Sequence, residues 1–166
     1  MKQVITRIKP FDTKKSLQKA TQKGSERKSW VLRSEDRLYA WDNNMGRVNI
    51  IRTGVPYSSI EEISLKMNRP IKAILSLVGI AQTTYNKKRS ENAIMDKRGS
   101  ESIVMLTELI GHGMDVFNNE TEKFQRWLKK PNISLGGNSP ESMLDTATGI
   151  QEVFNCLNRI EFGNMA

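Results

Sequence analysis

The stretch that most constrains the fold runs from Trp127 to Gly149 and reads WLKKPNISLGGNSPESMLDTATG. Pro131, Pro140 and the pair Gly136-Gly137 interrupt regular secondary structure within it. Such dense backbone punctuation predicts a compact corner at which short helices meet at fixed angles. The stretch holds no cluster of His, Cys or carboxylates at ligand or catalytic spacing, so it is interpreted first as an interaction surface.

Composition limits the chemistry that the chain can perform. It has 166 residues, 37% of them hydrophobic, which suits one domain or two small ones. Its single His, His112, lacks the companions that a metal or catalytic site requires, and the lone Cys156 sits among apolar helical positions, as a reduced core thiol does. No apolar run is long enough to span a membrane. We therefore expect a cytoplasmic protein that is not an enzyme and needs no metal or cofactor.

The charge of +8 is distributed unevenly along the chain. Residues 1–54 hold 13 Lys/Arg and 5 Asp/Glu, residues 55–100 hold 8 and 4, and residues 101–166 hold 5 and 9. A basic N-terminal half joined to an acidic C-terminal half suggests two partners of different charge, one of them the phosphate backbone of DNA.

Residues 1–46 are predicted to form a basic, largely disordered arm, since apolar side chains are scarce until Trp30. A lysine-rich solubilising tail explains the first 28 residues equally well. Ser34 followed by Glu35 and Asp36 predicts a short helix near 35–42.

Residues 47–100 are predicted to form a helix-turn-helix module. Ser59 and Glu62 have capping-box spacing, which predicts a helix over 59–67. The next helix begins near Pro70, with an apolar stripe over 71–78, and Gly79 supplies the left-handed residue that ends it. A third helix then runs from Ala81 or Gln82 to about Ser90.

The third helix carries the predicted DNA contacts. Tyr85 is expected to pack inward, which leaves the polar and basic side chains around it exposed. The candidate DNA-binding residues are Gln82, Thr83, Thr84, Asn86, Lys87, Lys88 and Arg89. An ordinary helical hairpin is the competing interpretation of the same residues.

Residues 101–166 are predicted to form a helical partner-binding and dimerisation domain. Ser100 is expected to cap an apolar helix that ends before Asn118-Asn119, and Thr148 with Gln151 to cap a final helix that ends at Gly163. No stretch alternates for long enough to build a sheet, so the predicted fold class is all-α.

From about Arg52 to Ala166 the chain resembles the Xre/MbcA/ParS-type antitoxins, the partners of RES-domain toxins. The resemblance rests on Gly54-Val55-Pro56, the helix-turn-helix, the sequence WLKKPNISLGGNSPESMLDT and the ending from Arg159 to Gly163. It implies an all-helical homodimer with an Xre-like helix-turn-helix module and a C-terminal toxin-binding domain. Such antitoxins cover the active site of a toxin that consumes NAD⁺ or transfers ADP-ribose, and many bind their own promoter.

The chain departs from the family pattern in two places. Ala81 stands where the family usually has Ser or Asn as the cap of the recognition helix, which weakens that cap by about 1 kcal/mol. The basic arm lies outside the matched region, so the resemblance does not explain it. A helix-turn-helix regulator without a toxin partner remains the alternative function.

Within the C-terminal domain, large apolar residues are expected to be structural: Trp127, Pro131, Leu135, Met143 and Leu144. The corner at 127–149 is thus predicted to be mainly a scaffold that aims the last helix. The expected toxin contacts form a polar tip beyond it: Asn158, Arg159, Glu161, Asn164, Met165 and Ala166. Arg159 equally suits the last-turn cation that a helix dipole favours.

Overall fold

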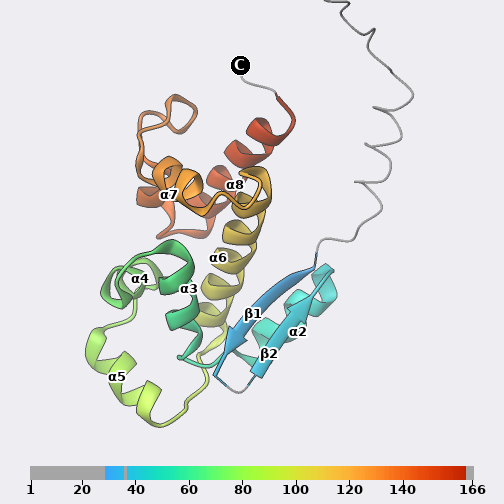
Figure 1. The fold of residues 1–166 in the computed structure, drawn as a ribbon. Helices are drawn as coiled ribbons and strands as arrows, with labels where there is room; N and C mark the ends of the chain where they lie inside the picture. Colours follow the sequence, from blue (N-terminus) through green and yellow to red (C-terminus); the bar gives the residue numbers. More distant parts are fainter. Residues whose placement is uncertain (1–28, 36, 164–166) are drawn as a thin grey trace, which may run out of the picture.

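The computed structural model describes residues 29–35 and 37–163. Its elements are a β1–β2 hairpin, the helices α2 to α7, two 3-10 helices η1 and η2, and the last helix α8. The long α6 (Lys97–Val116) is central, because the hairpin, α2, α3, α7 and α8 all contact it (Figure 1). The described chain is therefore mostly helical, with one small antiparallel sheet.

The hairpin is the main departure from the predicted fold. β1 (Trp30–Ser34) pairs with β2 (Arg37–Trp41), with Ser34 opposite Arg37. The short helix predicted near 35–42 is wrong, and the predicted disorder is wrong for the described residues before 47, because residues 30–34 and 37–41 form the hairpin and α2 begins at Asn44. Residues 1–28 lie outside the described part. The all-α prediction holds for the helices but misses this sheet.

Packing, rather than strand length, explains why these five-residue strands form. Leu32 and Trp41 are buried, and the Trp41 indole N–H donates a hydrogen bond to Glu108 of α6 at 2.8 Å. The Arg33 backbone N–H donates to the carboxylate of Glu62 in α3. An isolated hairpin is marginal in water, so its contacts with α3 and α6 supply the stability that the sequence pattern does not reveal.

The next helices are α2 (Asn44–Thr53), α3 (Ser59–Met67), α4 (Ile71–Val78) and α5 (Gln82–Ser90). The predicted ranges of α3, α4 and α5 are confirmed. The capping box that predicted α3 is wrong, because the Ser59 side chain is buried inside the helix and Ser58 takes the cap position without a side-chain hydrogen bond. Glu62 instead meets the Arg33 backbone N–H and forms an ion pair with Lys66 at 2.8 Å.

Asp96, and not Ser100, caps α6. Its carboxylate accepts a hydrogen bond from the Gly99 N–H at 2.8 Å, whereas the buried Ser100 hydroxyl accepts one from the Val55 N–H at 3.1 Å. The helix begins at Lys97, earlier than predicted, so the cap position falls on Asp96 and Ser100 lies inside the helix. The helix does end before Asn118 and Asn119, as predicted, and both adopt positive φ.

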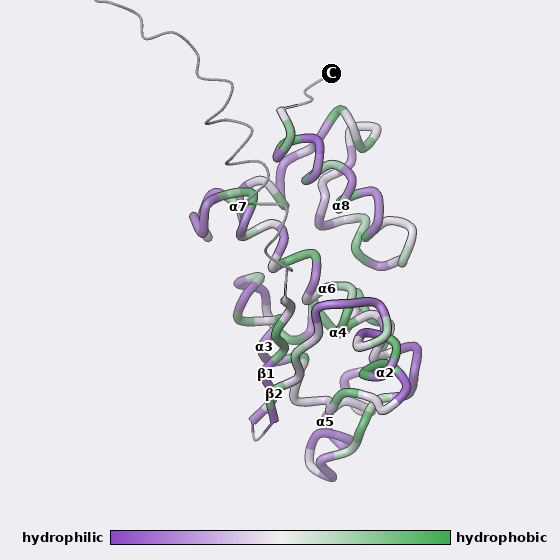
Figure 2. The backbone as a smooth tube through the Cα atoms, turned by 90° about the vertical axis from the view of Figure 1, so that its right-hand side faces the viewer, coloured by the Kyte–Doolittle hydropathy of each residue, from purple (hydrophilic) through white to green (hydrophobic). Residues whose placement is uncertain are grey.

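The C-terminal part contains α7 (Thr121–Lys129), η1 (Ile133–Leu135), η2 (Pro140–Met143) and α8 (Ala147–Glu161). Thr146, rather than the predicted Thr148, caps α8 by accepting from the Gly149 N–H at 3.0 Å. Along α7, hydrophobic positions interrupt a hydrophilic helix (Figure 2), and the hydrophobic Phe124 and Leu128 are its buried residues. α8 packs along α6, which places Glu161, the last residue of α8, beside His112 near the end of that central helix.

One apolar core joins the hairpin to the helices. Its largest fully buried side chains are Leu32, Ile60, Ile63, Met67, Ile74, Ile103, Leu106, Leu109, Ile110, Phe124, Leu144 and Leu157. Cys156 is a free thiol and is buried, as predicted, and burial raises the pKa of that thiol. Within residues 29–35 and 37–163, every helix is too short or too polar to cross a membrane.

Candidate nucleic-acid and partner interfaces

The turn between α4 and α5 has the backbone that the sequence predicted. Gly79 adopts φ 68° and ψ 32°, and the Ile80 N–H donates to the Leu75 carbonyl at 2.9 Å. This left-handed end of α4 redirects the chain so that α5 begins at Gln82, three residues after Gly79. Ala81 occupies the N-cap of α5 and makes no side-chain cap hydrogen bond. α5 therefore lacks the Ser or Asn cap that the family usually has at this position.

One side of α5 faces the protein and the rest faces solvent. Tyr85 is 5% exposed and packs into the core, as predicted. Gln82, Thr83, Thr84, Asn86 and Lys87 are all exposed. Gln82 donates to Asn86 at 2.9 Å along the helix surface. Lys88 lies 3.4 Å from Glu91.

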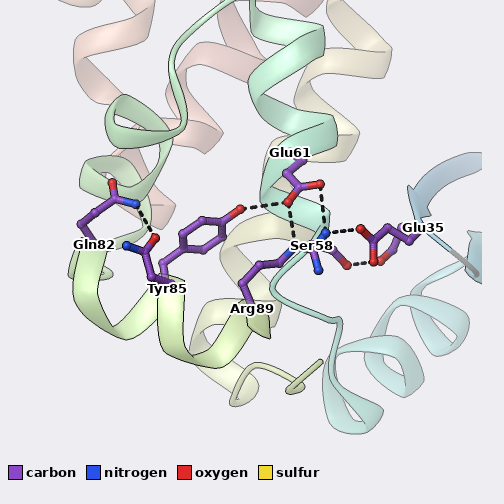
Figure 3. A network of polar contacts seen from close by, with 8 residues as sticks. Glu35, Ser58, Glu61, Gln82, Tyr85 and Arg89 are labelled. Carbon is purple, nitrogen blue, oxygen red and sulfur yellow. Dashed lines mark hydrogen bonds and ion pairs between the residues drawn. The ribbon is translucent and has the colours of Figure 1, made fainter. Parts of the chain in front are cut away.

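Arg89 differs from the other six candidate DNA contacts, because its guanidinium is engaged within the protein. It donates from Nε to the Glu61 carboxylate of α3 at 2.7 Å, and from Nη2 to the Glu35 carboxylate at the hairpin turn (Figure 3). The Tyr85 hydroxyl donates to the same Glu61 carboxylate at 3.1 Å. We call Glu35, Glu61, Tyr85 and Arg89 the Arg89 network. It joins three separate elements: the hairpin, α3 and α5.

The titration behaviour of the Arg89 network follows from its contacts. The hydrogen bond from Arg89 lowers the pKa of Glu61 below its ordinary value, against the opposing effect of burial. Burial and the Glu61 charge raise the pKa of Tyr85 to about 12. Glu61 and Glu35 also raise the pKa of Arg89, which stays cationic. At neutral pH the network therefore holds an ionised Glu61, a cationic Arg89 and a neutral Tyr85 phenol.

The segment from Trp127 to Gly149, which we call the glycine-rich corner, is held by its own backbone. Asn132, Ser139 and Thr146 each accept a hydrogen bond from a backbone N–H two or three residues ahead. A Cβ on Gly149, in the first turn of α8, would lie 1.9 Å from the Met143 carbonyl oxygen, so any other residue here would force the start of α8 away from η2. The corner therefore fixes the direction of α8.

Most of the side chains predicted to be structural in this corner are inside the protein. Leu135 and Leu144 are buried, and Met143 is half-buried. Trp127 is half-buried and packs near Phe117 and Phe124, with ring centroids 5.8 and 6.2 Å away. The aromatic cluster ties α7 to the end of α6. Pro131, in contrast, is exposed.

The residues predicted to form the toxin-binding tip lie in different surroundings. Arg159 is exposed, and Asn158 and Glu161 are half-buried. The Glu161 carboxylate lies 3.9 Å from Nε2 of the buried His112, whose ring stacks on Phe154 at a centroid distance of 4.4 Å. Glu161 thus faces α6 as well as the tip. Asn164, Met165 and Ala166 lie outside the described residues.

Two exposed apolar side chains in this region were missed by sequence reasoning. Ile133 of η1 is 97% exposed, and Phe162, directly after α8, is 72% exposed. Large apolar residues in the corner were expected to be core, and nothing in the local pattern separates the exposed Ile133 from the buried Leu135. Both exposed residues lie within residues 112–163.

Residues 112–163 match the family described as the antitoxin Xre/MbcA/ParS C-terminal toxin-binding domain. The chain is also 32% identical, over 114 residues, to "Antitoxin Xre" of Photorhabdus laumondii, an alignment that covers 69% of this chain and 77% of that protein. The chain belongs to the Xre/MbcA/ParS antitoxin family. The resemblance seen in the sequence is thereby confirmed.

Two further relatives of this family member extend the comparison. "Antitoxin Xre" of Yersinia enterocolitica is 29% identical over 116 residues, which cover 70% of this chain and 78% of the relative. "Prs ADP-ribosylating antitoxin" of Sphingobium sp. is 28% identical over 128 residues, which cover 72% of this chain and 80% of the relative. Each alignment is longer than the matched toxin-binding domain, so the similarity extends beyond it.

Proposed function

We propose that this chain is the antitoxin of a RES-domain toxin that consumes NAD⁺ or transfers ADP-ribose. The observation that carries the proposal is the match of residues 112–163 to a domain described as toxin-binding. The name of the Sphingobium relative, "Prs ADP-ribosylating antitoxin", supports the class of toxin chemistry. The role requires inhibition and no catalysis by this chain.

Neutralisation would proceed by covering the active site of the toxin. The glycine-rich corner fixes the direction of α8, and Arg159 in the last turn of α8 is exposed. Its cation, Arg159, and the polar residues near it suit a cleft that accommodates a pyrophosphate-bearing substrate. The dipole role of Arg159 in the last turn of α8 is the competing explanation.

The same chain would bind its own promoter as a homodimer through α5. The support is the pair of short helices α4 and α5, joined by the turn at Gly79, and the exposed polar side chains at the start of α5. Gln82, Thr83 and Thr84 would face base edges, while Lys87 and Lys88 would meet phosphates. Arg89 contributes by holding α5 on α3 and the hairpin, since its guanidinium is already shared by two carboxylates.

Co-expression tests the antitoxin role. The protein encoded by the adjacent reading frame is induced in cells with and without this chain. We expect growth arrest and loss of cellular NAD⁺ or appearance of ADP-ribosylated protein without the chain, and rescue with it. A neighbouring protein that is harmless on its own would contradict the proposal.

Deleting residues 162–166 tests the tip. The deletion leaves α8 (Ala147–Glu161) intact. We expect the shortened chain to bind the toxin more weakly and to lose most of its neutralisation. Unchanged neutralisation would show that the tip does not cover the active site.

A helix-turn-helix regulator without a toxin partner is the second candidate, and the exposed surface of α5 favours it. DNA binding alone does not separate the two, since both need it. Under this alternative the chain binds the promoter with a strong salt dependence, and the adjacent protein has no effect on growth. Changing Lys87 and Lys88 together to Ala would weaken promoter binding under either function; unchanged affinity would refute the assignment of α5.

A further inference from the structure

We propose that Ile133 is an anchor residue for the toxin, inserted into an apolar pocket on that partner's surface. The inference rests on the proposed toxin partner and names a contact outside the polar tip. A single exposed apolar side chain is ordinary on a protein surface. What distinguishes Ile133 is the combination of its exposure, 97%, with the rigidity of the loop that displays it.

The loop is closed by its own hydrogen bonds. Asn132 and Asn138 join its two ends, with the Asn132 N–H donating to the Asn138 carbonyl at 3.0 Å. The Asn132 carbonyl accepts from the Leu135 and Gly137 N–H groups, each at 3.0 Å, and the Ser134 N–H donates to the Asn132 side chain at 2.9 Å. These bonds leave the backbone around Ile133 little freedom.

Two residues of this loop, which spans residues 132–138, hold it against the rest of the protein. Leu135 is buried, and the Asn132 side-chain amide lies 3.4 Å from Sγ of Cys156 in α8. Gly136 and Gly137 adopt φ of 64° and 82°, which allows the chain to reverse directly after Leu135. The loop therefore points Leu135 into the protein and Ile133 out of it.

Such rigidity favours binding. A loop whose backbone is already fixed loses less conformational entropy when a partner covers it, so more of the gain from burying Ile133 appears as affinity. Residues that dominate binding energy are commonly apolar anchors that fill a partner's pocket. Ile133 is such an apolar side chain, exposed on a loop whose backbone is fixed by its own hydrogen bonds.

The location identifies the occupant. Ile133 lies within the matched toxin-binding domain. The loop between α7 and η2 and the last turn of α8 lie at the same end of the molecule (Figure 1). A partner that contacts Arg159 and the 72% exposed Phe162 at the end of α8 would therefore extend toward Ile133. Lys129 and Lys130 precede the loop and are exposed, so we expect acidic residues around the pocket that receives Ile133.

The test uses the full chain and the RES-domain protein encoded by the adjacent reading frame. Ile133→Ala should raise the Kd of the complex about ten- to fiftyfold, and Ile133→Asp more than a hundredfold, because each removes apolar area that the toxin buries. Leu65→Ala is the matched control, since Leu65 is 80% exposed on α3, outside the matched domain. Its Kd should stay within about twofold of the wild-type value.

The outcomes are separable. Thermal unfolding of the three variants should stay close to that of the wild type, because both side chains are exposed; a large drop for Ile133→Ala would mean that the side chain is structural and would overturn the inference. A Kd for Ile133→Asp within twofold of wild type, or an equal loss in Leu65→Ala, would also overturn it. If the wild type itself does not bind or neutralise the toxin, the proposed function fails instead.

Discussion

The Arg89 network and the glycine-rich corner solve the same structural problem in different ways. Each fixes the direction of a helix that is proposed to bind a partner: α5 in the first case and α8 in the second. The network uses charged side chains from α3, α5 and the hairpin turn. The corner uses caps, positive-φ glycines and one backbone contact too close for any Cβ.

Because the two regions are stabilised differently, they should be sensitive to different changes. Ion pairs between partly exposed groups contribute modestly and depend on salt and pH. Close backbone packing does not depend on ionisation and tolerates almost no change in volume. The position of α5 should therefore respond to solution conditions, and that of α8 to substitutions at glycine.

The largest effect is expected for Gly149→Ala. The new Cβ would overlap the Met143 carbonyl oxygen, which belongs to rigid backbone, so the start of α8 must shift. We expect a loss of about 3 kcal/mol in the free energy of unfolding, measured by urea denaturation, together with loss of toxin neutralisation. Gly137→Ala is the control: no atom lies within 4 Å of its Cβ, and only its φ of 82° opposes it, at a cost of about 1 kcal/mol. Equal losses in the two variants would contradict the packing argument.

A smaller effect is expected for Glu61→Gln, which removes the charge that Arg89 and Tyr85 share. We expect a loss of about 1 kcal/mol in unfolding free energy, decreasing at high salt, and weaker promoter binding as α5 loosens. Glu91→Gln, which breaks the exposed pair with Lys88, should change stability by less than about 0.5 kcal/mol. A salt-independent effect of Glu61→Gln would refute the electrostatic account.

The same variant predicts the pH dependence of stability. Because the folded-state pKa of Glu61 is lowered from its ordinary value of 4.5, its contribution is complete above that value and is lost as pH falls through the lower, folded pKa. The difference in unfolding free energy between wild type and Glu61→Gln should thus be constant near neutral pH and shrink below pH of about 4.5. Denaturation series at several pH values measure it. A difference that grows on acidification would have the wrong sign.

The smallest effect is expected for Ala81→Ser, which adds the missing cap of α5. The hydroxyl can accept from an unpaired N–H in the first turn, and we expect a gain of about 0.5 kcal/mol in unfolding free energy. Ala81→Val, which has no acceptor, should give no gain. A similar gain from valine would show that the first turn of α5 does not need a cap.

Sequence reasoning found the elements that local pattern determines. The apolar stripe of α4, the left-handed Gly79 and the end of α6 before Asn118-Asn119 all depend on residues close in sequence, and all are confirmed. The caps show its limit. Several Ser, Thr and Asp residues stood near each helix start, and only the path of the chain selects Asp96 and Thr146.

Long-range contacts explain the remaining misses. The hairpin has too few residues to show a strand pattern, and it is stable because it packs on α3 and α6. Arg89 meets Glu35, 54 residues away in sequence, so no local pattern indicates that its guanidinium is engaged. Likewise, Ile133 and Leu135 look equivalent in sequence, and only the fold buries one and exposes the other.

Inhibition of the toxin in vitro is the most direct test of the proposal that this chain neutralises it. The NAD⁺-consuming or ADP-ribosylating activity of the purified adjacent protein is measured while the full chain is titrated in. If the end of α8 covers the active site, as proposed, activity should fall linearly and reach zero at a fixed ratio of the two proteins. Full activity in the presence of excess, folded chain would contradict it.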